Sequence, residues 1–419
     1  MTKRDFLKTS IGVSAASFFQ PLEKLIPQFE NISPENLAKD EDFWAKIRAG
    51  YRLKPDYINL ENGYYCHVPE ETLNNYIAHA REVNYQASWY MRTVQWDNKD
   101  TVANRLAKLV DAEPGEVIIT RNTTESLDTI IAGFPWKQGD EAVYAEQDYG
   151  SMQHMFEQVA QERGIKNTVV SIPNHPKSDE EIVAIYENAI TAKTKLLMVC
   201  HIINITGHIL PIRKICDMAH KHGVEVMVDG AHAVGHFQFS MKDLDCDYYG
   251  SSLHKWLSAP LGAGLLFVKK EKTAQISPRF ADWGKEPADL RRLNHTGTHP
   301  VHTDLGVGNA IDYLEKLGLD RKEARMRYLQ NYWTDKVRAM PNIRVNTPVE
   351  RHRSCGIANV GVIGMKPKEM ANTLLDKYKI WTVAIDGVGV HGCRISPNIY
   401  TTTAELDVFV NALKEMAGQ

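Results

Sequence analysis

The sequence has few cysteines, little net charge and no long apolar run. Each of these absences argues against one class of protein. The formal net charge of the 419 residues is −3 at pH 7, so the chain has no basic footprint of a nucleic-acid-binding protein. No apolar stretch reaches the roughly 18 residues that span a membrane. The cysteines form no Cys-x-x-Cys pair, which argues against a zinc site and against a disulfide scaffold. They are Cys66, Cys200, Cys216, Cys246, Cys355 and Cys393.

The remaining composition is that of an ordinary globular protein. Apolar residues make up 43% of the chain and charged residues 24%, which is typical of soluble domains. No internal repeat or low-complexity segment is visible in the sequence. At roughly 100–200 residues per domain, the length predicts two or three domains.

The N-terminus resembles an export signal of the twin-arginine type. Residues 3–8 read KRDFLK, which matches two arginines, a spacer and Phe-Leu-Lys, except that a lysine replaces the first arginine. A modest apolar stretch of small residues follows, without a clean Ala-x-Ala cleavage site. We therefore expect residues 1–25 to be a signal and the protein to be periplasmic. The alternative is a basic, amphipathic N-terminal arm on a cytoplasmic protein.

Short apolar strands alternate with amphipathic helices from about residue 100 onward, and this pattern predicts an α/β fold with a mostly parallel sheet covered on both faces. After about residue 300, long helices are expected at 305–318 and 321–340, with strands near 356–364, 380–385 and 392–397. This change of texture predicts a second, smaller α+β domain. The strands expected in the first domain are 116–120, 141–146, 167–173, 194–202, 224–230 and 263–270, and the helices are 101–110, 123–134, 151–164, 179–191 and 212–223.

Polar residues follow several of these strands, at the edge where ligands bind in open α/β sheets. Lys255 stands within the stretch DYYGSSLHKWLSAPLGAGLLFV, and an amine buried among apolar groups can become a nucleophile toward carbonyls. Thr123 and Thr124 open a helix, whose free N–H groups and dipole favour an anion such as phosphate. The polar residues at the other strand ends are Tyr149, Asn204, Asp229 and His232.

Each of these residues also has a purely structural interpretation. Asp229 or the two threonines could cap helices, His232 could be a core histidine and Asn204 could serve a turn. Their joint order favours one cofactor, pyridoxal phosphate. This cofactor needs an amine, an anion beside its pyridinium nitrogen, a flat residue over the ring, a donor to the ring hydroxyl and a phosphate cup.

The chain resembles the class V aminotransferases, a branch of the fold-type I pyridoxal-phosphate enzymes. The resemblance covers roughly residues 55–415, and its most specific part is VDGAHAVGHF followed by DYYGSSLHKWLSAPLGAGLLFV. It implies a large domain with a mostly parallel, seven-stranded sheet and a smaller α+β C-terminal domain. The boundaries expected from it are an N-terminal arm at 26–55, a large cofactor-binding domain at 56–298 and a small domain at 299–419.

The resemblance also implies a role for each candidate residue. Lys255 would hold the cofactor covalently, Asp229 would pair with the pyridinium nitrogen and His232 would touch the ring hydroxyl. Tyr149 would stack on the ring, where desulfurases have a histidine, and Asn204 would lie near the ring hydroxyl and the substrate carboxylate. The residues expected at the phosphate are Thr123, Thr124, Ser252 and His254.

Two further residues follow from the resemblance. The segment NHTGTHPVHTDLGVGNAI is similar to the one through which family members reach the phosphate of the neighbouring subunit, so Thr298 would be that residue and the protein a homodimer. Arg394, in GCRISPNIY, matches the arginine that binds the substrate α-carboxylate. A planar guanidinium suits that task because it pairs bidentately with a carboxylate.

The resemblance leaves the reaction open among epimerisation, elimination, transamination and sulfur transfer on an amino acid or amino-acyl substrate. Once the substrate has replaced Lys255 on the cofactor, the freed amine is the expected general base at Cα. Cysteine desulfurases carry a nucleophilic cysteine on a mobile loop well before the arginine. Here the preceding segment IWTVAIDGVGVHGC is short and Cys393 is adjacent to Arg394, which disfavours a persulfide route.

The segments CRISPNIYTTTAELDVFVNAL and NGYYCHVP look most like the isopenicillin N epimerase-like group of the family. In that group, Tyr64, Tyr65 and the stretch SWYMRTVQW would line the substrate entrance. Within this stretch the candidates are Trp89, Tyr90 and Arg92, which could instead pack at a dimer interface.

A protein that binds the cofactor without turnover is the non-enzymatic alternative. Such a protein is expected to lose Lys255, Asp229 or Arg394. This chain keeps all three, which favours an enzyme.

Overall fold

The computed structural model describes residues 21–418 with the exception of residue 283. The export motif expected at residues 3–8 lies outside the described residues, so periplasmic export stays a prediction. Within the described part, no helix is long and apolar enough to cross a membrane.

A buried seven-stranded sheet is the largest element of the molecule. In chain order its strands are β2 (Val117–Thr120), β3 (Glu141–Ala145), β4 (Lys166–Val170), β5 (Thr194–Cys200), β6 (Glu225–Asp229), β7 (Tyr248–Ser252) and β8 (Gly264–Val268). Their spatial order is β2-β8-β7-β6-β5-β3-β4. Only β8 runs against the others, because it pairs antiparallel with both β7 and β2. The predicted fold, with a mostly parallel seven-stranded sheet, is therefore confirmed.

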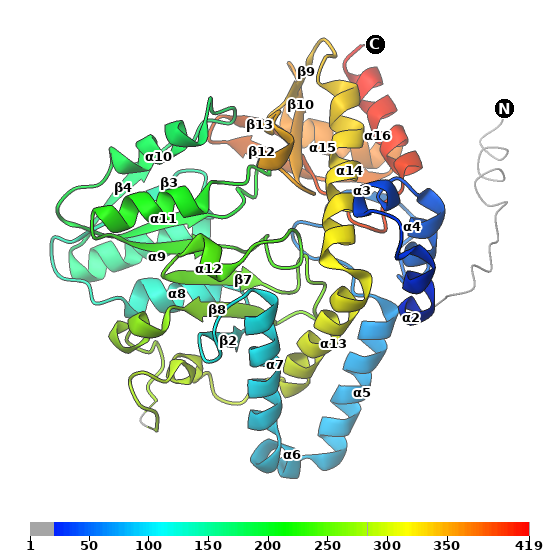
Figure 1. The fold of residues 1–419 in the computed structure, drawn as a ribbon. Coiled ribbons are helices and arrows are strands. Elements are labelled where there is room, and N and C mark those ends of the chain that lie inside the picture. Colours follow the sequence, from blue (N-terminus) through cyan, green and yellow to red (C-terminus); the bar gives the residue numbers. More distant parts are fainter. Residues whose placement is uncertain (1–20, 283, 419) are drawn as a thin grey trace.

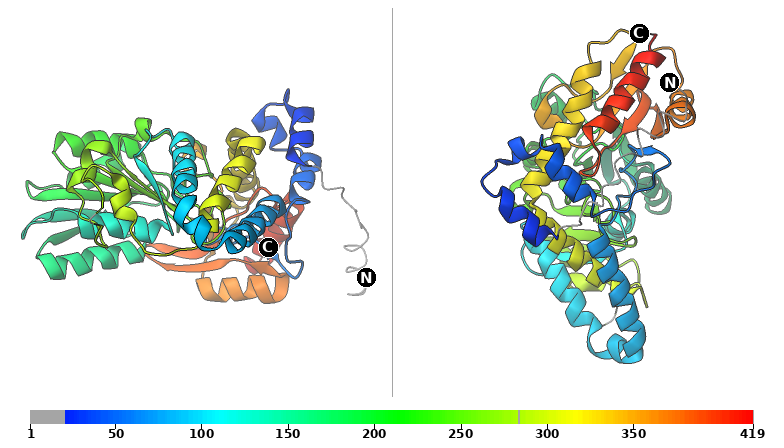
Figure 2. Two further views of the ribbon diagram at one scale, coloured as in Figure 1. Left: turned by 90° about the horizontal axis from the view of Figure 1, so that it is seen from below. Right: turned by 90° about the vertical axis from the view of Figure 1, so that its right-hand side faces the viewer.

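Helices cover both faces of this sheet (Figure 2). Alternate strand residues point to opposite faces, so Ile118 joins one apolar cluster and Ile119 the other. One face is covered by α8 (Thr123–Gly133) and α9 (Gly150–Arg163). The cluster on the other face contains residues of α7 (Gln95–Leu109), α10 (Asp179–Glu187), α11 (Ile212–Lys221), α12 (Met241–Leu244) and α13 (Val301–Leu317).

Within the seven-stranded sheet, β7 is the strand that the sequence pattern did not predict. Its sequence, YYGSS, has no apolar run, yet all five residues are buried. Gly250 lies under α8, where an added Cβ would come within 2.8 Å of the Leu127 side chain. The close approach of helix α8 thus requires small side chains in this strand. A short stretch of sequence does not show such packing between distant segments.

A second, antiparallel sheet forms the C-terminal part of the molecule, in the order β12-β13-β10-β9. Its helices pack on it through a separate apolar cluster that contains Trp333 and Phe409. The sheet consists of β9 (Ile343–Val345), β10 (Ala358–Val362), β12 (Val383–Gly387) and β13 (Val390–Ile395). The helices are α14 (Leu319–Val337), α15 (Pro367–Tyr378) and α16 (Thr403–Met416). This arrangement agrees with the expected smaller α+β domain.

The segment before residue 65 lies against this C-terminal part. Strand β1 (Ile58–Asn59) pairs in parallel with β11 (Ile380–Trp381), and Glu61 forms a bridge with Ser396. The helices that precede β1 pack beside α14 (Figure 1), where the buried Arg325 forms an ion pair with the partly exposed Glu41. These helices are α2 (Leu22–Leu25), η1 (Ile26–Phe29), α3 (Pro34–Leu37) and α4 (Glu41–Arg48). The expected domain boundaries at 56 and 298 stay predictions.

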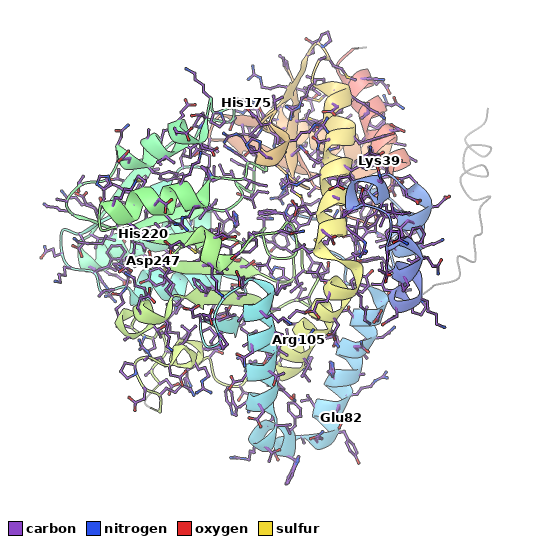
Figure 3. The ribbon with its side chains drawn as sticks, in the orientation of Figure 1. Lys39, Glu82, Arg105, His175, His220 and Asp247 are labelled. Carbon is purple, nitrogen blue, oxygen red and sulfur yellow. The ribbon has the colours of Figure 1, made fainter. Side chains whose placement is uncertain are left out.

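Three helices of the large part were not predicted: α5 (Glu70–Gln86), α6 (Ser88–Thr93) and the short α12. Together with α7, α5 and α6 form a projecting hairpin that packs against α13 (Figure 1). Arg105 of α7 reaches across to α13 (Figure 3), with 2.6 Å between its Nη2 and Oδ1 of Asp312. The short 3-10 helices are η2 (Lys270–Gln275), η3 (Leu290–Asn294) and η4 (Arg351–Arg353).

The loop between β5 and α11 makes a close contact with the C-terminal sheet. Gly207 has a φ of +76°, and a Cβ added there would lie 1.9 Å from the carbonyl oxygen of Ile357. We expect Gly207→Ala to lower the free energy of unfolding by about 2–5 kcal/mol, from left-handed strain plus overpacking. The measurement is the shift of the urea or thermal denaturation midpoint.

Gly223 provides the matched control for this prediction. It also has a positive φ, +70°, but an added Cβ would meet nothing within 4 Å. Gly223→Ala should therefore cost only the strain, about 1–2 kcal/mol. Equal midpoints for the two variants would contradict the close contact at Gly207.

Candidate active site

A cavity of about 330 Å³ opens at the carboxyl edge of the seven-stranded sheet. Tyr149 follows β3, Asn204 follows β5, Asp229 ends β6 and Ser252 ends β7. Because the carboxyl ends of parallel strands meet at one edge, residues far apart in the sequence converge there. The predicted residues that line the cavity are Thr123, Thr124, Tyr149, Asn204, Asp229, His232, Ser252, His254, Lys255 and Arg394.

The amine of Lys255 points into this cavity from the turn after β7. Its burial lowers the pKa of Lys255 to about 8, although the Asp229 carboxylate acts in the opposite direction. A lysine in water has a pKa of about 10.4, so the cavity makes the neutral amine available near physiological pH. A neutral amine has the lone pair that a nucleophile or a base requires.

His232 contacts this amine, and Trp256 determines which of its ring nitrogens carries the proton. The indole N–H of Trp256 donates to Nδ1 of His232 at 3.2 Å, so Nδ1 is an acceptor. Burial holds the pKa of His232 well below its ordinary value, so the ring is neutral and its single proton lies on Nε2. Nε2 is 3.0 Å from Nζ of Lys255. The histidine therefore donates to the lysine, and this arrangement favours the neutral amine.

A second histidine holds Trp256 in place. The ring of His236 stacks on the indole with 3.9 Å between centroids and 15° between planes. Its Nε2 accepts the N–H of Gly356 at 2.7 Å, which leaves Nδ1 to donate to the carbonyl oxygen of His232 at 2.8 Å. Both rings around His232 are thus fixed by hydrogen bonds.

Asp229 supplies a buried anion on the floor of the cavity. One of its oxygens accepts the N–H of Ala231 at 3.0 Å. Burial raises the pKa of Asp229 above its ordinary value, with the Ala231 bond and the Lys255 charge acting in the opposite direction. A buried carboxylate of this kind is stabilised by a cationic partner such as a pyridinium N–H.

The N-terminus of α8 forms the anion-binding wall. Ser252 Oγ accepts the N–H of Thr123 at 3.0 Å, and the Asn122 side chain accepts the N–H of Glu125 at 2.8 Å. In the described part of the chain, the N–H of Thr124 between them has no hydrogen-bond partner. The hydroxyl groups of Thr123 and Ser252 form a hydrogen bond of 2.7 Å, so the Thr123 side chain positions Ser252. A free N–H at a helix N-terminus suits a phosphate group.

The residues present fit pyridoxal phosphate. Lys255 can bond to its aldehyde carbon, Asp229 can pair with its ring nitrogen, and Thr124 faces its phosphate position. In addition, the buried side-chain oxygen Oδ1 of Asn204 has no hydrogen-bond partner among the described residues. A cofactor or substrate donor in the cavity would satisfy it.

Arg394 lines the cavity from β13, and Glu61 pairs with it. Nη2 and Nε of Arg394 lie 2.7 and 3.2 Å from the two carboxylate oxygens of Glu61. Nη1 donates to the carbonyl oxygen of Asn204 at 3.2 Å. Only 8% of each side chain of the ion pair is exposed.

Several expected residues do not line the cavity of this single chain. Thr298, expected to act on a neighbouring subunit, is absent from its walls. Trp89, Tyr90 and Arg92 lie in α6, on the projecting hairpin, and do not line the cavity of their own chain, so their assignment to the entrance stays a prediction. Local sequence could not place α6, because the hairpin is held by tertiary packing on α13. Of the other two expected entrance residues, Tyr64 lines the cavity, whereas Tyr65 contacts His254 beside it.

Sequence reasoning missed Trp256 and Glu61. Trp256 is next to Lys255 in the sequence, and an indole beside a cavity histidine was the available signal. Glu61 had no signal, because 333 residues separate it from Arg394. A larger cavity of about 540 Å³ lies between α7 and residues Asp282 and 285–295. It contains Trp96 of the stretch SWYMRTVQW but none of the residues predicted to bind the cofactor.

Comparison with known families agrees with this geometry. The family model described as Aminotransferase class-V matches residues 68–409. The chain belongs to the aminotransferase class-V family. As a member it is a pyridoxal-phosphate-dependent enzyme, in agreement with the fit of the cavity residues to that cofactor.

Relatives within the family include proteins with different activities. Isopenicillin N epimerase of Streptomyces clavuligerus is 26% identical over 397 residues, which cover 90% of this chain and 99% of the relative. A probable cysteine desulfurase of Halalkalibacterium halodurans is 26% identical over 377 residues, which cover 82% and 88% of the two chains. The resemblance to epimerase-like members is therefore confirmed, together with a similar likeness to desulfurases.

The solved structures that resemble the chain support the fold. The apo structure of a cysteine desulfurase from Thermococcus onnurineus NA1 superposes with a TM-score of 0.79 at 21% identity, covering 90% of this chain and 98% of the other. At this identity the similarity concerns the fold alone. It agrees with the fold-type I architecture expected for a class-V enzyme.

The low pKa of Lys255 leads to a pH prediction. We expect cofactor-free protein to capture added pyridoxal phosphate at a rate that rises with pH and levels off above about pH 8. Only the neutral amine attacks a carbonyl, and its fraction grows as the pH passes through the lysine pKa. The initial growth of the cofactor absorbance band gives the rate. A rate that still rises near pH 10, as for a lysine in water, would contradict the effect of burial.

The Trp256 hydrogen bond leads to a second prediction. In Trp256→Phe, Nδ1 of His232 is free to carry the proton, and Nε2 can then accept from a charged Lys255. The ammonium form of Lys255 then has an acceptor in Nε2 of His232, which raises the lysine pKa. The midpoint of the capture rate against pH should therefore move up by about one pH unit at most. Trp333→Phe is the matched control, because Trp333 is fully buried and its indole N–H donates to no described residue. An unchanged midpoint in Trp256→Phe would refute the assigned tautomer.

Proposed function

We propose that this class-V enzyme removes the Cα proton of an amino acid or amino-acyl substrate, leading to epimerisation or elimination. Pyridoxal phosphate, when bound, withdraws electrons from the Cα of an attached amino acid and weakens the bonds to that carbon. The protein supplies the binding groups and the proton transfers. The observation that carries the proposal is the enclosed amine of Lys255, whose pKa burial lowers to about 8, beside His232 and Asp229.

Each wall of the cavity has a separate task in this mechanism. Asp229 would hold the protonated ring nitrogen, and Nε2–H of His232 would donate to the ring hydroxyl. Lys255, displaced by the substrate amine, would accept the Cα proton. Elimination would then expel the substituent on Cβ, whereas inversion would require a proton to reach the opposite face of Cα. A lysine pKa of about 8 suits the proton transfer, because a general base works best when its pKa is near the working pH. Arg394 is the group for the substrate carboxylate.

The cysteines argue against sulfur transfer through a persulfide. All six are buried. Burial raises the pKa of each of the thiols, for example to about 12 in Cys66 and about 11 in Cys393. Cys200 lines the cavity, but burial and the nearby carboxylates of Asp148 and Asp229 raise its thiol pKa far above the ordinary value. The thiolate is the nucleophilic form of cysteine, so none of these side chains is prepared to attack.

Similarity supports the same choice. The isopenicillin N epimerases of Streptomyces clavuligerus and Amycolatopsis lactamdurans match 90% and 89% of this chain and almost their own whole lengths. The substrate is proposed as an α-amino acid or a peptide with a free α-amino group, because Lys255 has to be replaced by an amine. Transamination, carbon–sulfur cleavage and cofactor binding without turnover are the other outcomes that the experiment below distinguishes.

We also propose a homodimer and export to the periplasm. Thr298 lies outside the cavity of its own chain, as expected for a residue that serves a neighbouring subunit. The hairpin of α5–α7 exposes large side chains, among them Tyr85, Trp89 and Trp96. Apolar groups exposed on a projecting element are typical of an interface. The export proposal depends only on the KRDFLK motif at residues 3–8.

The proposal is tested by titration of the holoenzyme with L- and D-amino acids, cysteine derivatives included, in heavy water. We expect a change of the cofactor absorbance band and incorporation of deuterium at Cα, measured by mass spectrometry. Lys255→Ala should abolish both, because the base and the covalent attachment are lost. Lys366→Ala, an exposed lysine at the start of α15, should leave both unchanged.

The products separate the reaction classes. Inverted configuration indicates epimerisation, and a keto acid with ammonia or a thiol indicates elimination. Accumulation of pyridoxamine phosphate indicates transamination and would overturn the preferred reaction. A protein that stays colourless after addition of the cofactor would overturn the enzyme proposal itself.

A further inference from the structure

The pairing of Arg394 with Glu61 concerns how the site recognises a carboxylate. Glu61 approaches the side of the guanidinium that carries Nε and Nη2, at 3.2 and 2.7 Å. Both partners are 92% withdrawn from solvent, since 8% of each side chain is exposed. Such a bidentate, enclosed pair holds both the position and the plane of the guanidinium.

The remaining edge of Arg394 faces the cavity. Nη1 gives one hydrogen to the carbonyl oxygen of Asn204 at 3.2 Å, and a guanidinium has five N–H donors. Three are used by Glu61 and Asn204, which leaves one hydrogen on each terminal nitrogen. Arg394 belongs to the cavity wall, whereas Glu61 does not. Glu61 therefore lies outside the cavity wall, and two N–H hydrogens of the guanidinium have no partner among the described residues.

The segment that carries Glu61 is itself anchored. The N–H groups of Asn62 and Gly63 donate to Ser396 Oγ at 2.9 and 3.1 Å, and the N–H of Tyr64 donates to Oε1 of Glu61 at 2.9 Å. At Gly63, an added Cβ would come within 2.8 Å of the guanidinium carbon of Arg394. The backbone at Gly63 thus lies against the guanidinium, and Glu61 is held by Arg394 on one side and by the N–H of Tyr64 on the other.

We propose that Glu61 is a positioning residue that fixes Arg394 so that its terminal N–H edge receives the substrate carboxylate. This inference rests on the proposed function, because it assumes an amino-acid substrate on the cofactor. Glu61 also compensates the charge of Arg394, so geometry rather than net charge selects the carboxylate. A glutamate that competed with the substrate would have to leave, and its anchored position outside the cavity wall argues against that role.

The test compares two probes that differ only by a carboxylate, L-alanine and ethylamine. Their dissociation constants are measured from the absorbance change of the holoenzyme, which reports binding and not turnover. Glu61→Gln should weaken L-alanine about tenfold or more, the effect of one charge-assisted hydrogen bond, and leave ethylamine within about twofold. Arg394→Ala should have the same selective effect, and adding Glu61→Gln to it should change nothing further.

Glu323→Gln provides the matched control. Glu323 binds Arg327 through Nε at 2.8 Å in a part-buried pair outside the cavity, so its loss should alter neither dissociation constant. Tighter binding of L-alanine by Glu61→Gln would overturn the proposal and make Glu61 a competitor. Equal weakening of both probes would also overturn it, because Glu61 would then serve the fold in general.

A wild-type protein without a cofactor band would be a failure of the proposed function and not of this inference. In that case the same variants are compared by calorimetry with propionate, the carboxylate of alanine without its amine. Selective loss of propionate binding in Glu61→Gln and Arg394→Ala, with no change in Glu323→Gln, would support the positioning role. Unchanged propionate binding in Glu61→Gln would overturn it.

Discussion

The enclosed amine of Lys255, whose pKa burial lowers to about 8, is the constraint on which the other features of the site depend. An ammonium group loses its hydration when it is enclosed, so burial alone favours the uncharged form of Lys255. The hydrogen bond from Nε2 of His232 acts in the same direction, and Trp256 makes that bond available by occupying Nδ1. The indole is in turn held by His236. A chain of neutral rings therefore reaches from the core to the reactive nitrogen.

The charged groups of the cavity are arranged around the amine of Lys255. Asp229 is enclosed and forms no ion pair with the described residues, so its carboxylate suits a protonated ring nitrogen. Arg394 already has its counter-ion in Glu61, so it presents donors without adding a free charge beside Lys255. An unpaired arginine there would lower the lysine pKa further, and an unpaired glutamate would raise it. The pairing thus lets carboxylate recognition and amine reactivity coexist in one small space.

The sequence predicted the parts of the fold whose signal is local. Strands β3, β5 and β6 are apolar runs, and the polar residue after each run led directly to Tyr149, Asn204 and Asp229. The signal failed where long-range packing decides: β7 lacks an apolar run because α8 lies against Gly250, and α5 and α6 are held by α13. Glu61 illustrates the limit for the site, because its partner is 333 residues away and no spacing rule connects them.

The proposed carboxylate site lies where the two sheets meet. Arg394 comes from β13 of the C-terminal sheet, its acceptor Asn204 comes from the loop after β5 of the large sheet, and Glu61 follows β1, which pairs with β11. The β5 loop keeps its place because Gly207 abuts Ile357, just before β10. Since Lys255 lies in the turn after β7 of the large sheet, the distance between amine and guanidinium is set by how the two sheets dock. Under the proposed function, this packing between the sheets would limit the length of a substrate that spans the two groups.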